Sequence, residues 1–173
     1  MTVQELVDAC HWAEPGGREA AATILAFLDE IGIAAELGTV APEARLAGLE
    51  IAQGRLRLDP AAPIWPGDLL HEAGHIAVTD AALRPTLGDP GSDPAQEMAA
   101  QAWSAAAAIA CGVPLDVVFH EGGYHGHAQN LAMTFAGGNG PGAPMLAWYG
   151  MTAEPHRATP ELPGFPVMQR WLR

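Results

Sequence analysis

Residues 69–76 read LLHEAGHI, and this stretch decides the interpretation of the whole chain. His71 and His75 are four positions apart, so on an α-helix both imidazoles lie on one face and can share a tetrahedral ion. Glu72 lies about 100° further round the same helix, where a general base can take a proton from a metal-bound water. The stretch therefore predicts a helix that carries a metal site.

A catalytic zinc site uses three protein ligands and leaves the fourth position to water. Glu97 is the favoured third ligand, because Asp93-Pro94 predicts the start of a new helix just before it. A loop over residues 80–92 lets this helix fold back antiparallel and present Glu97 to the ion. His125 and His127 remain alternatives for the third ligand.

Residues 49–58 precede the histidine helix and predict a β-hairpin. A two-residue turn at Gln53-Gly54 places the large apolar side chains of both arms on one face and opposite charges on the other. The pairs expected across the hairpin are Leu49 with Leu58, Ile51 with Leu56 and Glu50 with Arg57.

Hairpin, histidine helix and glutamate helix together resemble the gluzincins, the thermolysin-like zinc peptidases, whose pattern is HExxH followed by a glutamate on the next helix. The resemblance covers residues 49–104, and the small size is similar to the minimal core of small intracellular members. It implies one Zn²⁺ per chain and hydrolysis of a peptide or protein substrate. Its specific positions are His71, Glu72, His75 and Glu97. In thermolysin an aspartate four residues after the ligand glutamate supports a ligand histidine; Gln101 stands there in this chain and can accept a hydrogen bond from His71.

The segment from His120 to His127 contains three histidines, a tyrosine and three glycines, and we expect a flexible loop that reaches the metal or a substrate. Tyr124 is the favoured donor to the oxyanion of the tetrahedral intermediate, since a phenol stays protonated at neutral pH. His125 and His127 are the alternatives for that role.

The expected fold class is α+β, with residues 1–173 forming one domain around a minimal gluzincin-like zincin core. Extra helices occupy residues 1–32, the metal-binding core occupies 33–112, and a Gly/Pro/His-rich part, residues 113–173, lines or covers the site. Helices outside the core are expected from Thr2-Glu5, whose capping-box pattern opens the first, and at about residues 18–31, 127–136 and 143–150.

Charge and composition limit the classes of partner, and the cellular location, that we expect for this protein. The 20 acidic and 8 basic residues give a net charge of −12, which repels phosphate backbones and anionic lipid, so we expect no nucleic-acid and no membrane partner. Cys10 and Cys111 lack metal-type spacing and predict free thiols in a reducing compartment. The N-terminal residues lack the pattern of a signal peptide, so a cytoplasmic location is expected. The alanine-rich helix at 94–111 allows a homodimer.

The favoured function is that of a zinc-dependent hydrolase, specifically a metallopeptidase in which Glu72 activates the water. Two alternatives stay open. One is a non-proteolytic gluzincin-like module that keeps the metal site for regulation or partner binding. The other is a zinc hydrolase of another amide or an ester.

Overall fold

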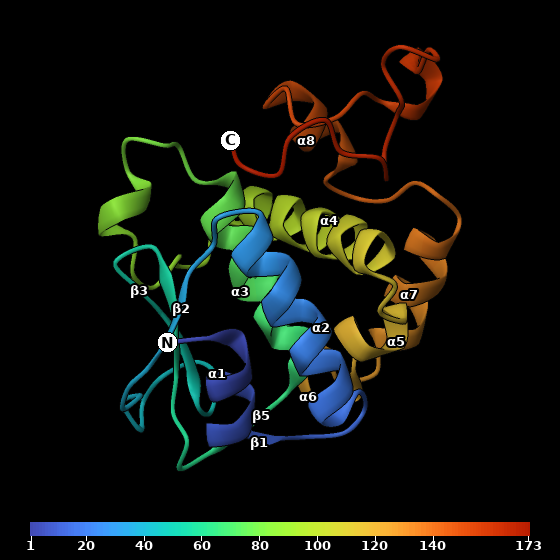
Figure 1. The fold of residues 1–173 in the computed structure, drawn as a ribbon. Coiled ribbons are helices and arrows are strands. Elements are labelled where there is room, and N and C mark those ends of the chain that lie inside the picture. Colours follow the sequence, from blue (N-terminus) through green and yellow to red (C-terminus); the bar gives the residue numbers. More distant parts are fainter.

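A computed structural model describes residues 1–173 and combines a small sheet with a group of helices (Figure 1). Helix makes up about 47% of the chain and strand about 10%, so the fold is mixed α+β, as predicted. The strands are β1 (His11–Trp12), β2 (Ala35–Leu37), β3 (Leu49–Ala52), β4 (Arg55–Leu58) and β5 (Pro63–Ile64). The α-helices are α1 (Val3–Ala9), α2 (Gly17–Glu30), α3 (Pro66–Val78), α4 (Pro94–Cys111), α5 (Leu115–Val118), α6 (Glu121–Tyr124), α7 (Ala128–Ala136) and α8 (Ala143–Trp148), with 3-10 turns at Arg84–Thr86 and Pro155–Arg157.

The predicted hairpin is confirmed with its register. Gln53 and Gly54 form the turn with φ of +52° and +70°, the left-handed values that a two-residue turn of this kind requires. Strand β2 joins β4 in parallel on its other side, so the sheet order is β2-β4-β3 and β3 is an edge strand. The cross-strand pairs of the hairpin are Leu49 with Leu58, Glu50 with Arg57, Ile51 with Leu56 and Ala52 with Arg55.

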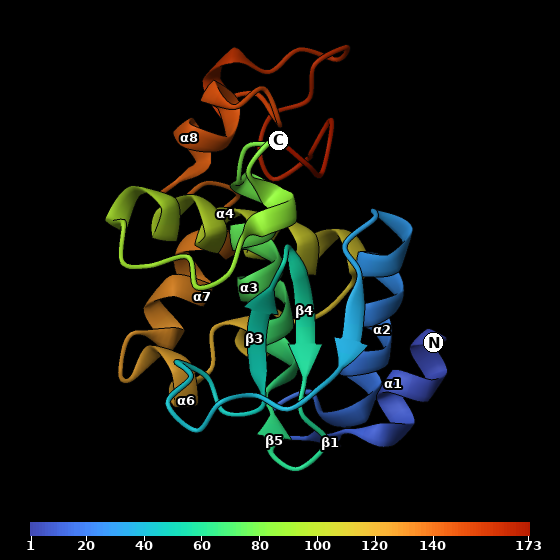
Figure 2. The same cartoon turned by 90° about the vertical axis from the view of Figure 1, so that its left-hand side faces the viewer.

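Helix α3 lies at the centre of the fold. The sheet covers one side of it, and α2 and α4 pack against the rest (Figures 1 and 2). All 13 residues of α3 are buried. A helix that is buried all round must satisfy its polar side chains inside the protein, so the partners of those side chains are informative.

Helix α4 packs closely on α3 through small side chains. The alanines between residues 99 and 108 are buried within the chain. The small side chains let the two helices approach each other closely, and the homodimer expected from the alanine-rich helix stays a prediction.

The predicted helices at the two ends of the chain are present, with differences. Thr2 and Glu5 form the expected capping box of α1, but α1 ends at Ala9 because His11–Trp12 then pairs as β1 with β5. Helices α7 and α8 lie where they were predicted. One turn of helix, α6, replaces part of the loop expected at residues 120–127. Both cysteines are free, and none of the helices combines the length and apolarity that a bilayer crossing requires.

Candidate metal centre

Helix α3 brings two histidine nitrogens face to face inside the protein. Pro66 begins the helix at a position where its fixed φ and missing N–H are tolerated. His71 and His75 are only 7% and 1% exposed, and their Nε2 atoms lie 3.3 Å apart. The four-residue spacing therefore does place both imidazoles at one point.

Helix α4 adds a carboxylate to this pair. Asp93 caps α4 by accepting a hydrogen bond from the backbone N–H of Ala95 at 2.9 Å, so Glu97 falls in the first turn. Its Oε1 lies 3.4 Å from His71 Nε2, and its Oε2 lies 3.3 Å from His75 Nε2. The structure thus places Glu97 where the sequence predicted a third ligand.

Gly74 allows α3 and α4 to come this close. A Cβ atom at this position would lie 2.7 Å from the carbonyl oxygen of Ala100 and 3.1 Å from its Cα. Both contacts are with backbone, which cannot rotate away as a side chain can. The glycine inside the motif is therefore a packing requirement of the site.

His71, His75 and Glu97, called the cluster below, form the only group of three or more histidine, cysteine or acidic residues in the chain arranged to hold a metal ion. A tetrahedral ion with ligand distances of about 2.0–2.1 Å separates its ligand atoms by about 3.3–3.4 Å. The two Nε2 atoms lie 3.3 Å apart, and each faces a different oxygen of Glu97: His71 faces Oε1 at 3.4 Å and His75 faces Oε2 at 3.3 Å. The imidazole nitrogens therefore have the spacing of two ligands of such an ion, and one ligand atom from each of the three residues lies within 4.8 Å of the others.

The protonation of the cluster also suits a cation. Burial lowers the pKa of His71 to about 4, because it penalises the imidazolium. The hydrogen bond from His75 is the main cause that lowers the pKa of Glu97 to about 2. At neutral pH His71 is neutral and Glu97 is a carboxylate, which are the forms that bind metals.

Two polar side chains form hydrogen bonds with residues of the cluster. The Tyr124 hydroxyl lies 3.2 Å from Nδ1 of His71, and Gln101 donates from Nε2 to Oε1 of Glu97 at 3.2 Å. The predicted hydrogen bond between Gln101 and His71 is therefore wrong. Gln101 lies one turn after Glu97 on α4 and bonds to that ligand instead. The other ring nitrogen of His71, Nδ1, is in contact with the Tyr124 hydroxyl. Burial raises the pKa of Tyr124 and keeps the phenol protonated. Its role as oxyanion donor stays a prediction.

Glu72 lines a cleft that runs beside strand β3. The side chain is 4% exposed, and burial raises its pKa to about 7. The cleft has a volume of about 250 Å³ and is also lined by Arg45 and by Leu49 and Ile51 of β3. Nη2 of Arg45 reaches to 3.7 Å from Oε2 of Glu97. The cleft therefore brings together the edge strand, Glu72 and Arg45, and Arg45 connects it to Glu97 of the cluster.

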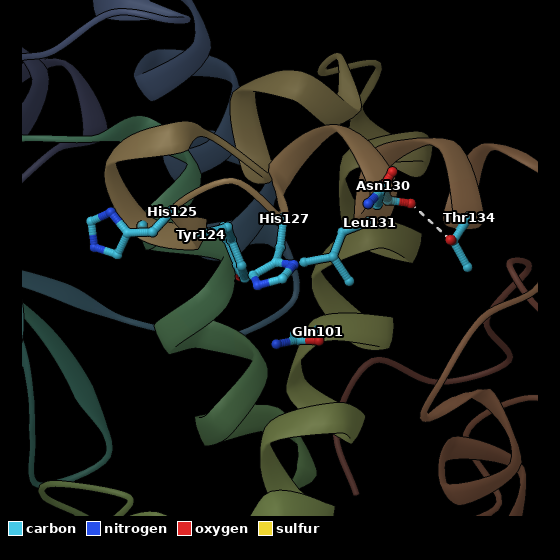
Figure 3. A pocket seen from close by; sticks show the side chains of 8 residues that line it. Gln101, Tyr124, His125, His127, Asn130, Leu131 and Thr134 are labelled. Atoms are coloured by element: carbon cyan, nitrogen blue, oxygen red, sulfur yellow. Dashed lines mark hydrogen bonds between the residues drawn. The ribbon is translucent and has the colours of Figure 1, made fainter.

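A larger cavity, of about 540 Å³, adjoins the cluster through Gln101 and Tyr124 (Figure 3). His125 and His127 also line it, but both are exposed and neither belongs to the cluster. Figure 3 shows that His125 points away from Gln101. Glu97, and not either of these histidines, thus completes the group of three. The remaining lining residues are Gly123, Asn130, Leu131 and Thr134.

Two features of the site could not be predicted from the sequence. Arg45 lies in an irregular segment that matches no motif, so nothing in the sequence indicated its contact with Glu97. Asp68 lies in the first turn of α3, where an acidic side chain is common because it favours the helix dipole. Its Oδ1 accepts a hydrogen bond at 2.9 Å from Nε2 of His120. That pair spans 52 residues, and no local spacing can reveal such a contact.

Fold and site together define a class: an α+β protein with a His-His-Glu cluster between two packed helices, its histidines buried and its glutamate partly exposed, that could hold a metal ion. No protein-family model, curated protein or solved structure matches the chain. The chemistry is therefore argued from the geometry of the cluster and of the cleft beside it.

Proposed function

We propose that this protein is a zinc-dependent hydrolase, and specifically a metallopeptidase with a gluzincin-like core. The observation that carries the proposal is the grouping of one ligand atom each from His71, His75 and Glu97 within 4.8 Å of one another, with the two Nε2 atoms 3.3 Å apart. The order of hairpin, HExxH helix and glutamate-bearing helix supports it. So does the position of Glu72 in the adjoining cleft.

Zinc is the metal that this donor set favours. Two imidazoles and one carboxylate are a ligand set of catalytic zinc sites, and they leave the fourth position open. A zinc ion held there would polarise a substrate carbonyl and lower the pKa of a bound water.

Glu72 supplies the proton transfers. Its carboxylate takes a proton from the attacking water and passes it to the amine that leaves when the C–N bond breaks. It follows His71 directly in the chain, so α3 positions the base together with two of the three ligands, His71 and His75. Because Glu72 lies in the cleft and outside the cluster, it remains free to act as a base.

Strand β3 offers a place for an extended peptide. It lies at the edge of the sheet, and an edge strand can pair its free backbone groups with an added chain. The cleft lies along this strand, since Leu49, Glu50 and Ile51 all line it. A peptide paired with β3 would therefore pass close to Glu72.

One zinc ion per chain is the expected metal content, with imidazole–metal distances of about 2.0–2.1 Å. Metal analysis of the dialysed protein gives the stoichiometry, and an anomalous scan of its crystals at the zinc edge gives the position. His75→Ala, which lacks one ligand, is the control and should lose the ion. A preference for manganese or nickel over zinc would contradict the assignment.

Cleavage of a peptide library by the zinc-loaded protein tests the hydrolase. We expect new amino termini by mass spectrometry, loss of the activity with a chelator and its return on adding zinc. His75→Ala under the same conditions controls for a contaminating peptidase. If zinc binds but a broad library and a panel of small amides and esters remain intact, the proposal is overturned in favour of a regulatory module that keeps the metal site.

A further inference from the structure

Asp68 and His120 form a buried polar pair that is separate from the cluster. Asp68 belongs to α3 and His120 precedes α6, and they are 6% and 3% exposed. Their contact, at 2.9 Å, joins Oδ1 to Nε2. A buried polar pair is seldom more stabilising than a well-packed apolar one, so stability alone does not explain why this pair is present.

His120 determines the position of α6. Its carbonyl oxygen accepts the backbone N–H of Gly123 at 3.1 Å and that of Tyr124 at 3.0 Å. Its imidazole stacks on Trp65, the residue just before α3, with ring centroids 4.4 Å apart and planes 10° apart. A Cβ atom at Gly122 would approach the Trp65 ring to 2.8 Å. Helix α6 therefore packs directly against the stacked rings of Trp65 and His120.

Tyr124 connects this turn to the cluster. Its ring packs edge-on to Phe119 and His120, and its hydroxyl lies 3.2 Å from Nδ1 of His71. In the tautomer that leaves Nε2 free for a metal, Nδ1 carries the hydrogen and donates it to the tyrosine oxygen. Such a partner fixes the orientation of a ligand histidine and increases its affinity for the metal.

We propose that Asp68 and His120 act as a latch that holds α6 against α3 and so positions Tyr124 to orient His71 for metal binding. In this role all three are positioning residues, because they are outside the cluster and act on the metal site through His71. The inference rests on the proposed metal site. It explains why the chain keeps a buried carboxylate on α3 one turn before its ligand and its base.

A double-mutant cycle tests the latch. Zinc affinity is measured by competition with a chromophoric chelator for the wild type, Asp68→Ala, Tyr124→Phe and the double variant. Each single change should weaken zinc binding by about 10–100-fold, as expected for loss of an outer partner of a ligand histidine. The double variant should bind about as weakly as the weaker single variant, because both changes interrupt one connection.

Two further variants separate positioning from a general loss of stability. Asp68→Asn keeps the size and an acceptor oxygen, so it should restore most of the affinity lost in Asp68→Ala. Thr152→Val removes the hydrogen bond of another buried side chain, from Thr152 Oγ1 to the carbonyl of Val167 at 2.6 Å, and should leave zinc affinity unchanged. The d–d spectrum of cobalt-loaded Tyr124→Phe should differ from that of the wild type.

The outcomes also distinguish the latch from the proposed function. Unchanged zinc affinity in Asp68→Ala, or losses that multiply in the double variant, would overturn the latch even if the protein hydrolyses peptides. A wild-type protein that hydrolyses nothing but shows the expected cycle would keep the latch and lose the hydrolase. A wild-type protein that binds no zinc would remove both.

Discussion

Replacing Glu72 by glutamine should abolish hydrolysis while leaving zinc in place. Glutamine is nearly isosteric and can still hydrogen-bond a water, but it cannot accept a proton at neutral pH. Loss of a general base lowers turnover by about two or more orders of magnitude. Glu72 is not part of the cluster, so zinc content should match that of the wild type. Turnover of a peptide identified in the library and metal analysis of the same sample give the two readings.

His75→Ala is the matched control for Glu72→Gln, because it changes a ligand on the same helix. Removal of a ligand should release zinc and destabilise the surrounding fold. The two variants should thus both be inactive but differ in zinc content. If Glu72→Gln also loses its zinc, the carboxylate is a ligand and the assignment of Glu72 as base is wrong. Full turnover by Glu72→Gln would equally rule the base out.

Local patterns were enough to predict the elements that build the site. In the hairpin, side-chain alternation and the Gln53-Gly54 turn determine the register between them, and the pairs observed are those predicted. In α4, Asp93 and Pro94 mark the first turn, which places Glu97 one turn into the helix. Such signals are short-range, so the sequence is sufficient to predict them.

Contacts between segments that are distant in the chain could not be predicted from the sequence. The glycines around residues 122–126 suggested a flexible loop, but the pairing of His120 with Asp68 and the stacking on Trp65 hold part of it as helix α6. Gln101 was assigned to His71 by resemblance, whereas its own helix places it next to Glu97. Arg45 reaches the cluster from an irregular segment. In each case packing determines the partner.

Gly74→Ala should disrupt the metal centre although it changes no ligand. Helix propensity alone predicts that alanine stabilises α3 by about 1 kcal/mol relative to glycine. Packing predicts the opposite, because the new Cβ would lie 2.7 Å from the carbonyl oxygen of Ala100 and 3.1 Å from its Cα. Overpacking of this kind costs about 1–3 kcal/mol. Since the contact is with backbone, the two helices must separate, and Glu97 moves away from both histidines with α4.

The expected result is a fall in zinc affinity of at least about 10-fold, the lower end of what a disturbed outer partner costs, together with a lower midpoint of thermal unfolding. Gly88→Ala is the matched control: a Cβ there meets only the carbonyl oxygen of Ile51, at 4.0 Å, so zinc binding should be unchanged. A Gly74→Ala protein that is more stable and binds zinc normally would show that helix propensity outweighs the contact. The close approach of α3 and α4 would then not be what holds Glu97 at the cluster. If Gly74→Ala weakens zinc binding and Gly88→Ala does not, the glycine of the motif supports the metal site by allowing α3 and α4 to lie close together.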